Sequence, residues 1–348
     1  MTDRMSGSAV SAPVRVGLLG SGGIGAFHGE SIARRIAGAE LAAVADPAPG
    51  AAERLAAALG CERPMTDPEE LIRDPAVEAI VIAAPPTAHA DLIEAAAEAG
   101  KAIFCEKPMA LTLPDADRAI EAAAAAGVPL QVGFNRRFAA DFEAAHDVVS
   151  SGELGRPQLM RSLTRDPVLD DPSKVKPWTI FLETLIHDFD ALCWLNPGSE
   201  PVVVYATADA LVRPDYKDRG LLDTAVVNIR FDNGAMATAE ASFQAVYGYD
   251  VRGEVFGSAG MVTAGDVRRS SATFYGAGGL ASDTTRHNTE LFRDAYTREL
   301  EHFAECVRAG ATPRCTGEDA RRALGIALAA IESVRSAGPV RLQEVEAG

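Results

Sequence analysis

Short apolar runs alternate with longer stretches of helical periodicity over roughly the first third of the chain. The runs have the length of buried β-strands and lie at residues 16–19, 41–45, 80–83, 102–105 and 130–133. The stretches between them predict helices at 24–36, 51–59, 90–99 and 114–126. Repeated β-α-β units place helices on both faces of a parallel sheet. We therefore predict a doubly wound α/β domain of the Rossmann type.

The pattern changes after a further helix, predicted at 142–150. Strand-like segments now follow one another closely, at 159–164, 202–208, 224–231, 236–243, 252–256 and 272–275. Asp232-Asn233-Gly234 separates two of them and favours a tight hairpin, because Asn and Gly tolerate positive φ. Helices at 290–309 and 318–336 close the chain, with Thr316 placed to cap the second. This half is predicted to be an α+β domain with an open, mostly antiparallel sheet.

The length of 348 residues agrees with two domains. We assign the Rossmann domain to residues 14–135 and the α+β domain to residues 136–341. Residues 1–13 are small and polar without the apolar core of a signal peptide, and we expect a disordered tail there.

Charge and cysteine content exclude several partners. The chain carries 33 basic and 49 acidic side chains, a net charge of −16, which disfavours nucleic acid and anionic membrane surfaces. No apolar stretch reaches the roughly 18–20 residues that span a bilayer. The five cysteines are scattered, so we expect reduced thiols and a cytoplasmic location. The histidines outside the motifs discussed below form no metal-ligand pattern, and no metal is predicted.

A glycine-rich turn follows the first predicted strand and opens the first helix. It reads Gly20-Ser21-Gly22-Gly23-Ile24-Gly25, a G-x-G-x-x-G in strand–turn–helix context. The first glycine permits a tight turn, the second lets the backbone approach a pyrophosphate, and the third lets helix and strand pack closely. The alternative is a glycine-rich loop without a ligand. The context favours a dinucleotide site formed by Gly20, Gly22, Gly23, Ile24 and Gly25.

Asp46 ends the second predicted strand, 21 residues after Gly25. An acidic side chain near this spacing binds the ribose 2′-hydroxyl of NAD. Its negative charge would repel a 2′-phosphate, and no arginine follows directly to receive one. The sequence therefore favours NAD over NADP, although Asp46 could also cap the next helix.

Two further segments carry candidate chemistry. Lys107 directly follows a predicted strand, at the sheet edge where ligands of open α/β folds bind. Glu183 and His187 lie four residues apart in an apolar segment of helical character, so both can face one cleft. Histidine is the side chain best suited to take a proton near neutral pH. Taken singly, the lysine could be a solvated surface residue and the histidine a structural one.

Together these motifs resemble the glucose–fructose oxidoreductase/inositol dehydrogenase (Gfo/Idh/MocA) family, over residues 14 to about 334. The matching segments, in order, are 20–25, Asp46, Ala99-Gly100-Lys101, Glu106-Lys107-Pro108, 133–138 and 183–190. Thr184-Leu185-Ile186-His187 and Tyr247-Gly248-Tyr249-Asp250 look most like inositol 2-dehydrogenases. The resemblance implies NAD as cofactor, a small polyhydroxylated substrate and oxidation of a secondary hydroxyl to a ketone.

The resemblance also implies roles for single residues. Lys107 matches a catalytic lysine that hydrogen-bonds the reacting hydroxyl, and His187 matches the general acid/base. Glu183 stands where inositol dehydrogenases typically have a substrate-binding aspartate, so its longer side chain is a departure. Further substrate contacts are expected from Asn135, Arg136, Thr184 and Tyr249. Further cofactor contacts are expected from Pro85, His89 and Glu106.

The substrate remains open between several readings. The leading one is myo-inositol or a modified inositol. The Ala- and Arg-rich composition is typical of high-GC bacteria, some of which make aminocyclitol antibiotics, such as those with a streptidine ring, through inositol-dehydrogenase-like enzymes. A cationic cyclitol would explain Glu183. The alternatives are a pyranose or nucleotide sugar on the same fold, and a non-catalytic NAD-binding sensor or scaffold. The resemblance also implies that residues 14–135 bind NAD, that residues 136–341 bind the substrate and form the oligomer, and that the protein is a homodimer or homotetramer.

Overall fold

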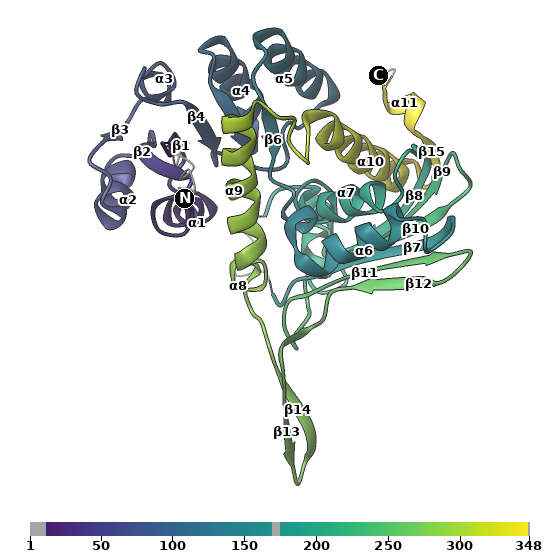
Figure 1. Cartoon of the computed structure of the whole chain (residues 1–348). Helices are drawn as coiled ribbons and strands as arrows, with labels where there is room; N and C mark the ends of the chain where they lie inside the picture. Colours follow the sequence, from purple (N-terminus) through teal and green to yellow (C-terminus); the bar gives the residue numbers. More distant parts are fainter. Residues whose placement is uncertain (1–11, 169–174, 347–348) are drawn as a thin grey trace, which may run out of the picture.

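A computed structural model describes residues 12–168 and 175–346 of the chain (Figure 1). Residues 1–11 of the predicted tail lie outside this part. No helix in the described ranges is long and apolar enough to cross a membrane.

The first half forms a parallel sheet of six strands in the order β3-β2-β1-β4-β5-β6. Its strands are β1 (Val14–Leu19), β2 (Ala39–Ala45), β3 (Pro64–Met65), β4 (Ala79–Ile82), β5 (Ala102–Cys105) and β6 (Leu130–Val132). The connecting helices are α1 (Gly23–Arg34), α2 (Ala51–Leu59), α3 (Pro68–Ile72), α4 (His89–Glu98) and α5 (Leu113–Ala126). The predicted Rossmann fold is confirmed. Periodicity missed β3 and α3, because two and five residues are too short to display it.

The second half contains a sheet of seven strands in the order β12-β11-β7-β10-β9-β8-β15. They are β7 (Pro157–Arg165), β8 (Pro201–Asp209), β9 (Thr224–Phe231), β10 (Met236–Ser242), β11 (Asp250–Gly257), β12 (Met261–Ala264) and β15 (Val340–Arg341). Among the described strands of this sheet, only β7 and β10 pair in parallel, so the expectation of a mostly antiparallel sheet is confirmed. The predicted Asp232–Gly234 turn joins the antiparallel pair β9 and β10.

Long helices near the end of the chain connect the two sheets. The helix α9 (Arg293–Ala309) packs against α1, β1 and β5 of the Rossmann half, and α10 (Gly317–Ser336) packs against α5, α7 and β8 (Figure 1). The predicted cap of α10 is confirmed: the Thr316 hydroxyl accepts the Asp319 N–H, and the Asp319 carboxylate accepts the Thr316 N–H. This capping box fixes where the helix starts, and thus how it lies across both halves.

Three further helical segments border the region between the halves. They are α6 (Ala140–Ser150), α7 (Ile186–Trp194) and the short turn η2 (Asn135–Phe138). A two-stranded hairpin, β13 (Arg268–Gly276) and β14 (Gly279–Thr284), projects away from the body of the molecule (Figure 1). It leads into α8 (Asn288–Leu291), directly before α9.

Candidate active site

A cavity of about 230 Å³ lies where the carboxyl end of β5 meets the second half of the chain. Lys107 enters it from the Rossmann side, two residues after β5. The other lining residues come from η2, the end of β7, α7 and the turn before it, the segment between β10 and β11, and the stretch from α8 into α9. They are Asn135, Arg136, Thr164, Asp166, Thr179, Glu183, Thr184, His187, Phe243, Tyr249, Asn288, Phe292 and Tyr296. The structure thus gathers in one cavity all seven residues predicted from the sequence to act in catalysis or to contact substrate.

Lys107 and Glu183 meet through the main chain. The Lys107 ammonium group donates a hydrogen bond to the Glu183 carbonyl oxygen over 2.9 Å. Glu183 lies in a π-helical turn, Ile180–Thr184, marked by the bond from the Leu185 N–H to the Ile180 carbonyl at 2.9 Å. The Glu183 carboxylate makes no ion pair within the described residues, so it stays available to a ligand.

His187 lies on the first turn of α7 and packs its ring edge-on against Phe134, with centroids 5.8 Å apart. Burial lowers the pKa of His187 well below its ordinary value, and the positive charges of Lys107 and Arg136 lower it further. The imidazole is therefore neutral near pH 7. A neutral imidazole in a cavity can accept a proton, as a general base must.

Arg136 forms part of the cavity wall, but its guanidinium is held from behind. It pairs with Asp188 at 2.6 Å and also contacts the hydroxyls of Ser162 and Thr164. Ser162 and Thr164 in turn donate to Asp188 at 2.5 and 2.7 Å. Arg136 and Asp188 are each at most 2 % exposed. A buried pair held by several hydrogen bonds is rigid, so Arg136 presents a fixed positive charge to the cavity.

Sequence reasoning missed Asp166, which directly follows β7 and lines the cavity. Its carboxylate accepts a hydrogen bond from Tyr249, while its Oδ1 atom is buried without a partner among the described residues. Burial raises the pKa of Asp166 to about 6, against the opposing effects of Tyr249, Lys107 and Arg136. The only available signal was its position at a strand end, which many residues share.

The glycine-rich turn has the shape that a pyrophosphate needs. Gly20 adopts φ +98°, and a Cβ there would lie 2.5 Å from the Ala83 carbonyl oxygen. A Cβ on Gly25 would lie 2.1 Å from the Gly20 oxygen, so the third glycine is required for close packing. Gly22 and Gly23 face open space at the start of α1, where a helix N-terminus favours an anion.

Asp46 closes this turn from the end of β2. Its carboxylate accepts hydrogen bonds from the Ser21 N–H at 2.8 Å, the Ser21 hydroxyl at 2.6 Å and the Ala48 N–H at 2.8 Å. These bonds lower the pKa of Asp46 despite the opposing effect of burial, so the group is ionised. The residues present therefore fit NAD: an open glycine cradle for the phosphates, with a fixed carboxylate beside it.

His89, Pro85 and Glu106 support the loops around this site. The two ring nitrogens of His89 face the carbonyl oxygens of Pro108 and Ala84, each at 2.8 Å. This histidine thereby joins the turn that starts at Pro85 to the segment that follows Lys107. The Glu106 carboxylate points into the fold, where His28 contacts it at 2.6 Å. Any contribution of His89 and Glu106 to cofactor binding through these atoms is thus indirect.

A phosphate-binding Rossmann turn and a neighbouring cavity with a lysine and a neutral histidine define a nicotinamide-nucleotide-dependent dehydrogenase. Residues 14–134 match the family model described as an oxidoreductase family with an NAD-binding Rossmann fold, and residues 142–263 match the C-terminal domain model of the same family. The chain belongs to the Gfo/Idh/MocA oxidoreductase family, as the resemblance predicted.

Related proteins and solved structures match this chain over almost its whole length. It is 38% identical to the scyllo-inositol 2-dehydrogenase (NAD(+)) of Bacillus subtilis, covering 94% of this chain and 96% of the relative. It is also 38% identical to the myo-inositol 2-dehydrogenase of Thermotoga maritima, covering 95% and 99%. A solved structure of Lactobacillus casei scyllo-inositol dehydrogenase with bound NAD(H) and scyllo-inositol superposes with a TM-score of 0.91 at 26% identity, covering 95% and 99%.

Proposed function

We propose that the protein is an NAD-dependent dehydrogenase that oxidises a secondary hydroxyl of a cyclitol, myo-inositol or a modified inositol, to a ketone. The observation that carries this proposal is the joint presence of Lys107, Glu183 and the neutral His187 in one polar cavity. The relatives named above support the substrate class.

In the proposed reaction, Lys107 and His187 hold the reacting hydroxyl between them. His187 accepts the hydroxyl proton, and the Lys107 ammonium stabilises the oxygen as negative charge develops on it. NAD⁺, when bound, accepts the hydride from the substrate carbon, leaving a ketone and NADH. Arg136 and Asp166 border the same cavity and bind further hydroxyls, while Asn135, Thr184 and Tyr249 complete the polar wall.

Glu183 indicates which kind of cyclitol the protein prefers. Glu183 lines the cavity, and its carboxylate has no ion-pair partner among the described residues. A substrate amino or guanidino group would supply the missing positive charge. We therefore infer an aminated cyclitol, of the kind used in aminocyclitol antibiotic synthesis, as the preferred substrate.

We also propose a homotetramer, built from homodimers. Four exposed apolar side chains form a continuous row across β10, β7, β11 and β12, because each is the direct cross-strand partner of the next: Met236, Leu159, Phe256 and Met261. Such a row favours a second copy of the same face. The projecting hairpin carries a separate exposed set, Phe274, Tyr275 and Leu280. Two distinct apolar surfaces support two kinds of interface, which a tetramer built from dimers requires.

The division at residue 135 and the cytoplasmic location remain predictions. The location is supported by the five free cysteines, Cys61, Cys105, Cys193, Cys306 and Cys315.

The test is steady-state NADH production with a panel of myo-inositol, scyllo-inositol, an aminated inositol, aldoses and a nucleotide sugar. We expect turnover of cyclitols, with the highest kcat/KM for the aminated one. Turnover of myo-inositol alone would contradict the role given to Glu183. Turnover of the sugars alone would show that the substrate is a sugar and not a cyclitol. No NADH with any compound would favour a non-catalytic sensor or scaffold.

The proposed oligomer is tested separately. Light scattering on the protein as it elutes from a size-exclusion column measures the mass of the oligomer, and Leu159→Asp should dissociate it.

A further inference from the structure

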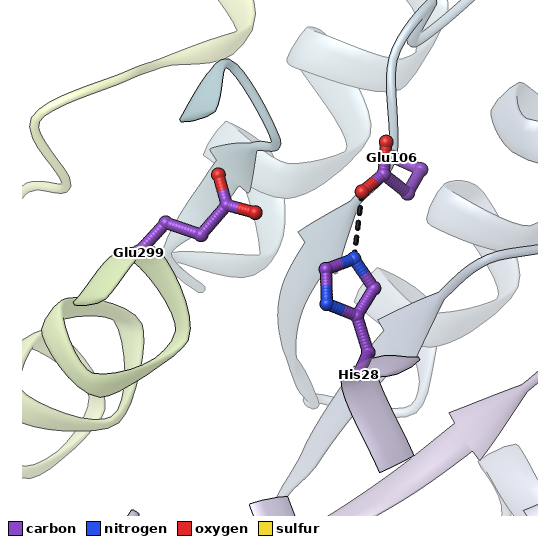
Figure 2. Close-up of side chains that lie close together, drawn as sticks. All are labelled: His28, Glu106 and Glu299. Carbon is purple, nitrogen blue, oxygen red and sulfur yellow. Dashed lines mark hydrogen bonds and ion pairs between the residues drawn. The ribbon is translucent and has the colours of Figure 1, made fainter. Parts of the chain in front are cut away.

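A second polar cluster lies behind the active-site lysine, inside the fold. It consists of His28 on α1, Glu106 at the end of β5 and Glu299 on α9, brought together from three distant parts of the sequence (Figure 2). One ligand-type atom of each lies within 4.8 Å of those of the other two. His28 and Glu299 are fully buried, and Glu106 is 6 % exposed. Sequence reasoning considered the histidines alone and therefore missed this group.

The hydrogen bonds around Glu106 are almost complete. Its Oε1 atom lies 2.6 Å from His28 Nε2, which donates because a carboxylate only accepts. Its Oε2 atom accepts the backbone N–H of Lys107 at 3.2 Å. Through this second bond, the position of the Glu106 carboxylate fixes the backbone that carries Lys107.

The carboxyl group of Glu299, unlike that of Glu106, lacks hydrogen-bond partners in the described part of the chain. Neither of its carboxylate oxygens has a hydrogen-bond partner among the described residues, and the same holds for Nδ1 of His28. Figure 2 shows the Glu299 side chain extending from α9 toward the His28–Glu106 pair. Gln131 holds that turn of the helix by donating to the Glu299 carbonyl oxygen at 2.8 Å. The unpartnered carboxyl is thus aimed at a carboxylate that accepts hydrogen bonds.

Two ionised carboxylates cannot be buried together here without a cation to pair with. Burial raises the pKa of Glu299 well above its ordinary value, and the charge of Glu106 raises it further. The hydrogen bond from His28 lowers the pKa of Glu106 despite burial. Glu299 is therefore the protonated carboxyl and Glu106 the ionised one, as in other buried carboxyl pairs whose surroundings separate their pKa values.

Among the described residues, no cation pairs with Glu299. The titratable side chains around the cluster itself are His28, Glu106, Lys107, His89, Tyr296 and Cys315. The elements packed against α9 add Arg15, Glu30, Arg34, Cys105, Arg136, Arg137 and Glu290. Of all these groups, only Glu106 shifts the pKa of Glu299. Arg136 is paired with Asp188, Arg137 with Asp190, and the Lys107 ammonium donates to the Glu183 carbonyl oxygen. A proton is thus the simplest source of positive charge for Glu299.

We propose that Glu299 is a positioning residue for Lys107: its protonated carboxyl donates a hydrogen bond to the Glu106 carboxylate, directly or through one bridging water, and so fixes the strand end that carries Lys107. A separation within 4.8 Å suits either arrangement. The contribution to turnover rests on the proposed dehydrogenase function, whereas the protonation of Glu299 does not.

The first experiment measures protonation without using activity. Urea unfolding of the wild type and of Glu299→Gln, at equal protein concentration with EDTA, is followed from pH 5 to pH 8. Unfolding releases the Glu299 proton above the unfolded pKa of about 4.3. The unfolding constant of the wild type relative to the variant should therefore rise by up to about tenfold per pH unit, until the folded-state pKa is passed. A ratio independent of pH would overturn the proposal.

A divalent cation is the competing occupant of the cluster. Thermal unfolding is repeated with Zn²⁺ or Mn²⁺ in place of EDTA. We expect the metal to shift wild type and Glu299→Gln equally. A stabilisation confined to the wild type would make Glu299 an ionised metal ligand, and would overturn the proposal.

The second experiment measures positioning. Glu299→Leu removes the donor at similar volume, and we expect kcat to fall by about tenfold or more with the KM for NAD changed by less than about twofold. Glu299→Gln keeps a neutral donor and should recover most of kcat. Glu301→Leu, an exposed position on the same helix, is the matched control. Wild-type kcat in Glu299→Leu would overturn the positioning role. A wild type without dehydrogenase activity would instead overturn the proposed function, and the unfolding experiment would still decide the protonation state.

Discussion

Lys107 and Glu106 are neighbours in sequence but belong to opposite kinds of environment. Lys107 projects into the cavity, where His187 and the Glu183 carboxylate have few fixed partners. Glu106 turns inward, where His28 and the Lys107 backbone hold its carboxylate. The difference separates two tasks. Groups that bind and transform a ligand must stay available, whereas groups that hold them in place must have their own hydrogen bonds satisfied inside the fold.

The largest expected effect comes from the cavity side. Lys107→Ala and His187→Ala should each lower kcat by at least about a hundredfold, because each removes a group that interacts with the reacting hydroxyl. Binding of NADH, measured by its fluorescence, should be retained. Lys217→Ala, which removes an exposed lysine paired with Asp209, is the control. Near-wild-type turnover in either cavity variant would contradict the catalytic role of the substituted residue.

A smaller effect is expected at Glu183. Glu183→Gln keeps size and removes charge, so kcat/KM for an aminated cyclitol should fall about tenfold, while that for myo-inositol changes by less than about threefold. Glu183→Asp tests reach instead of charge, and should favour the neutral cyclitol. Equal losses for both substrates in the Gln variant would show that charge is not what Glu183 recognises.

The smallest expected effect concerns Asp166 and is a pH dependence of the substrate KM. Its pKa of about 6 means that the carboxylate is ionised at pH 7 and becomes protonated as the pH falls. The substrate KM should therefore rise below about pH 6, and Asp166→Asn should show a higher KM without that dependence. Tyr249→Phe removes the bond that favours the ionised form, so the midpoint should move upward. A KM profile unchanged by Asp166→Asn would remove Asp166 from substrate binding.

Local patterns were enough to predict much of the molecule. The β-α-β alternation, the glycine turn and the Asp232–Gly234 hairpin depend on contacts within a few residues, which sequence periodicity reports directly. Lys107 was predicted from its position at a strand end. Glu183 and His187 were predicted to share a face because they are four residues apart, although a π-helical turn, and not a regular helix, carries Glu183 into the cavity.

Asp166 and the partners of Glu106 could not be predicted in this way. His28, Glu106 and Glu299 are separated by 78 and 193 residues along the chain, and nothing in any one of their segments marks it as polar core. Arg136 was expected at the substrate, and only the structure showed that Asp188 holds it at 2.6 Å.

The sequence by itself determined the order of secondary structure, the class of cofactor site and the residue types available for catalysis, because these depend on short-range periodicity and on the chemistry of single side chains. Tertiary structure alone decided which polar groups remain free in the cavity and which are used up inside the fold. That division depends on burial and on long-range pairing. The packing of α9 against β5 and α1 buries Glu299 beside Glu106, whereas burial near Lys107 and Arg136 sets the pKa values of His187 and Asp166.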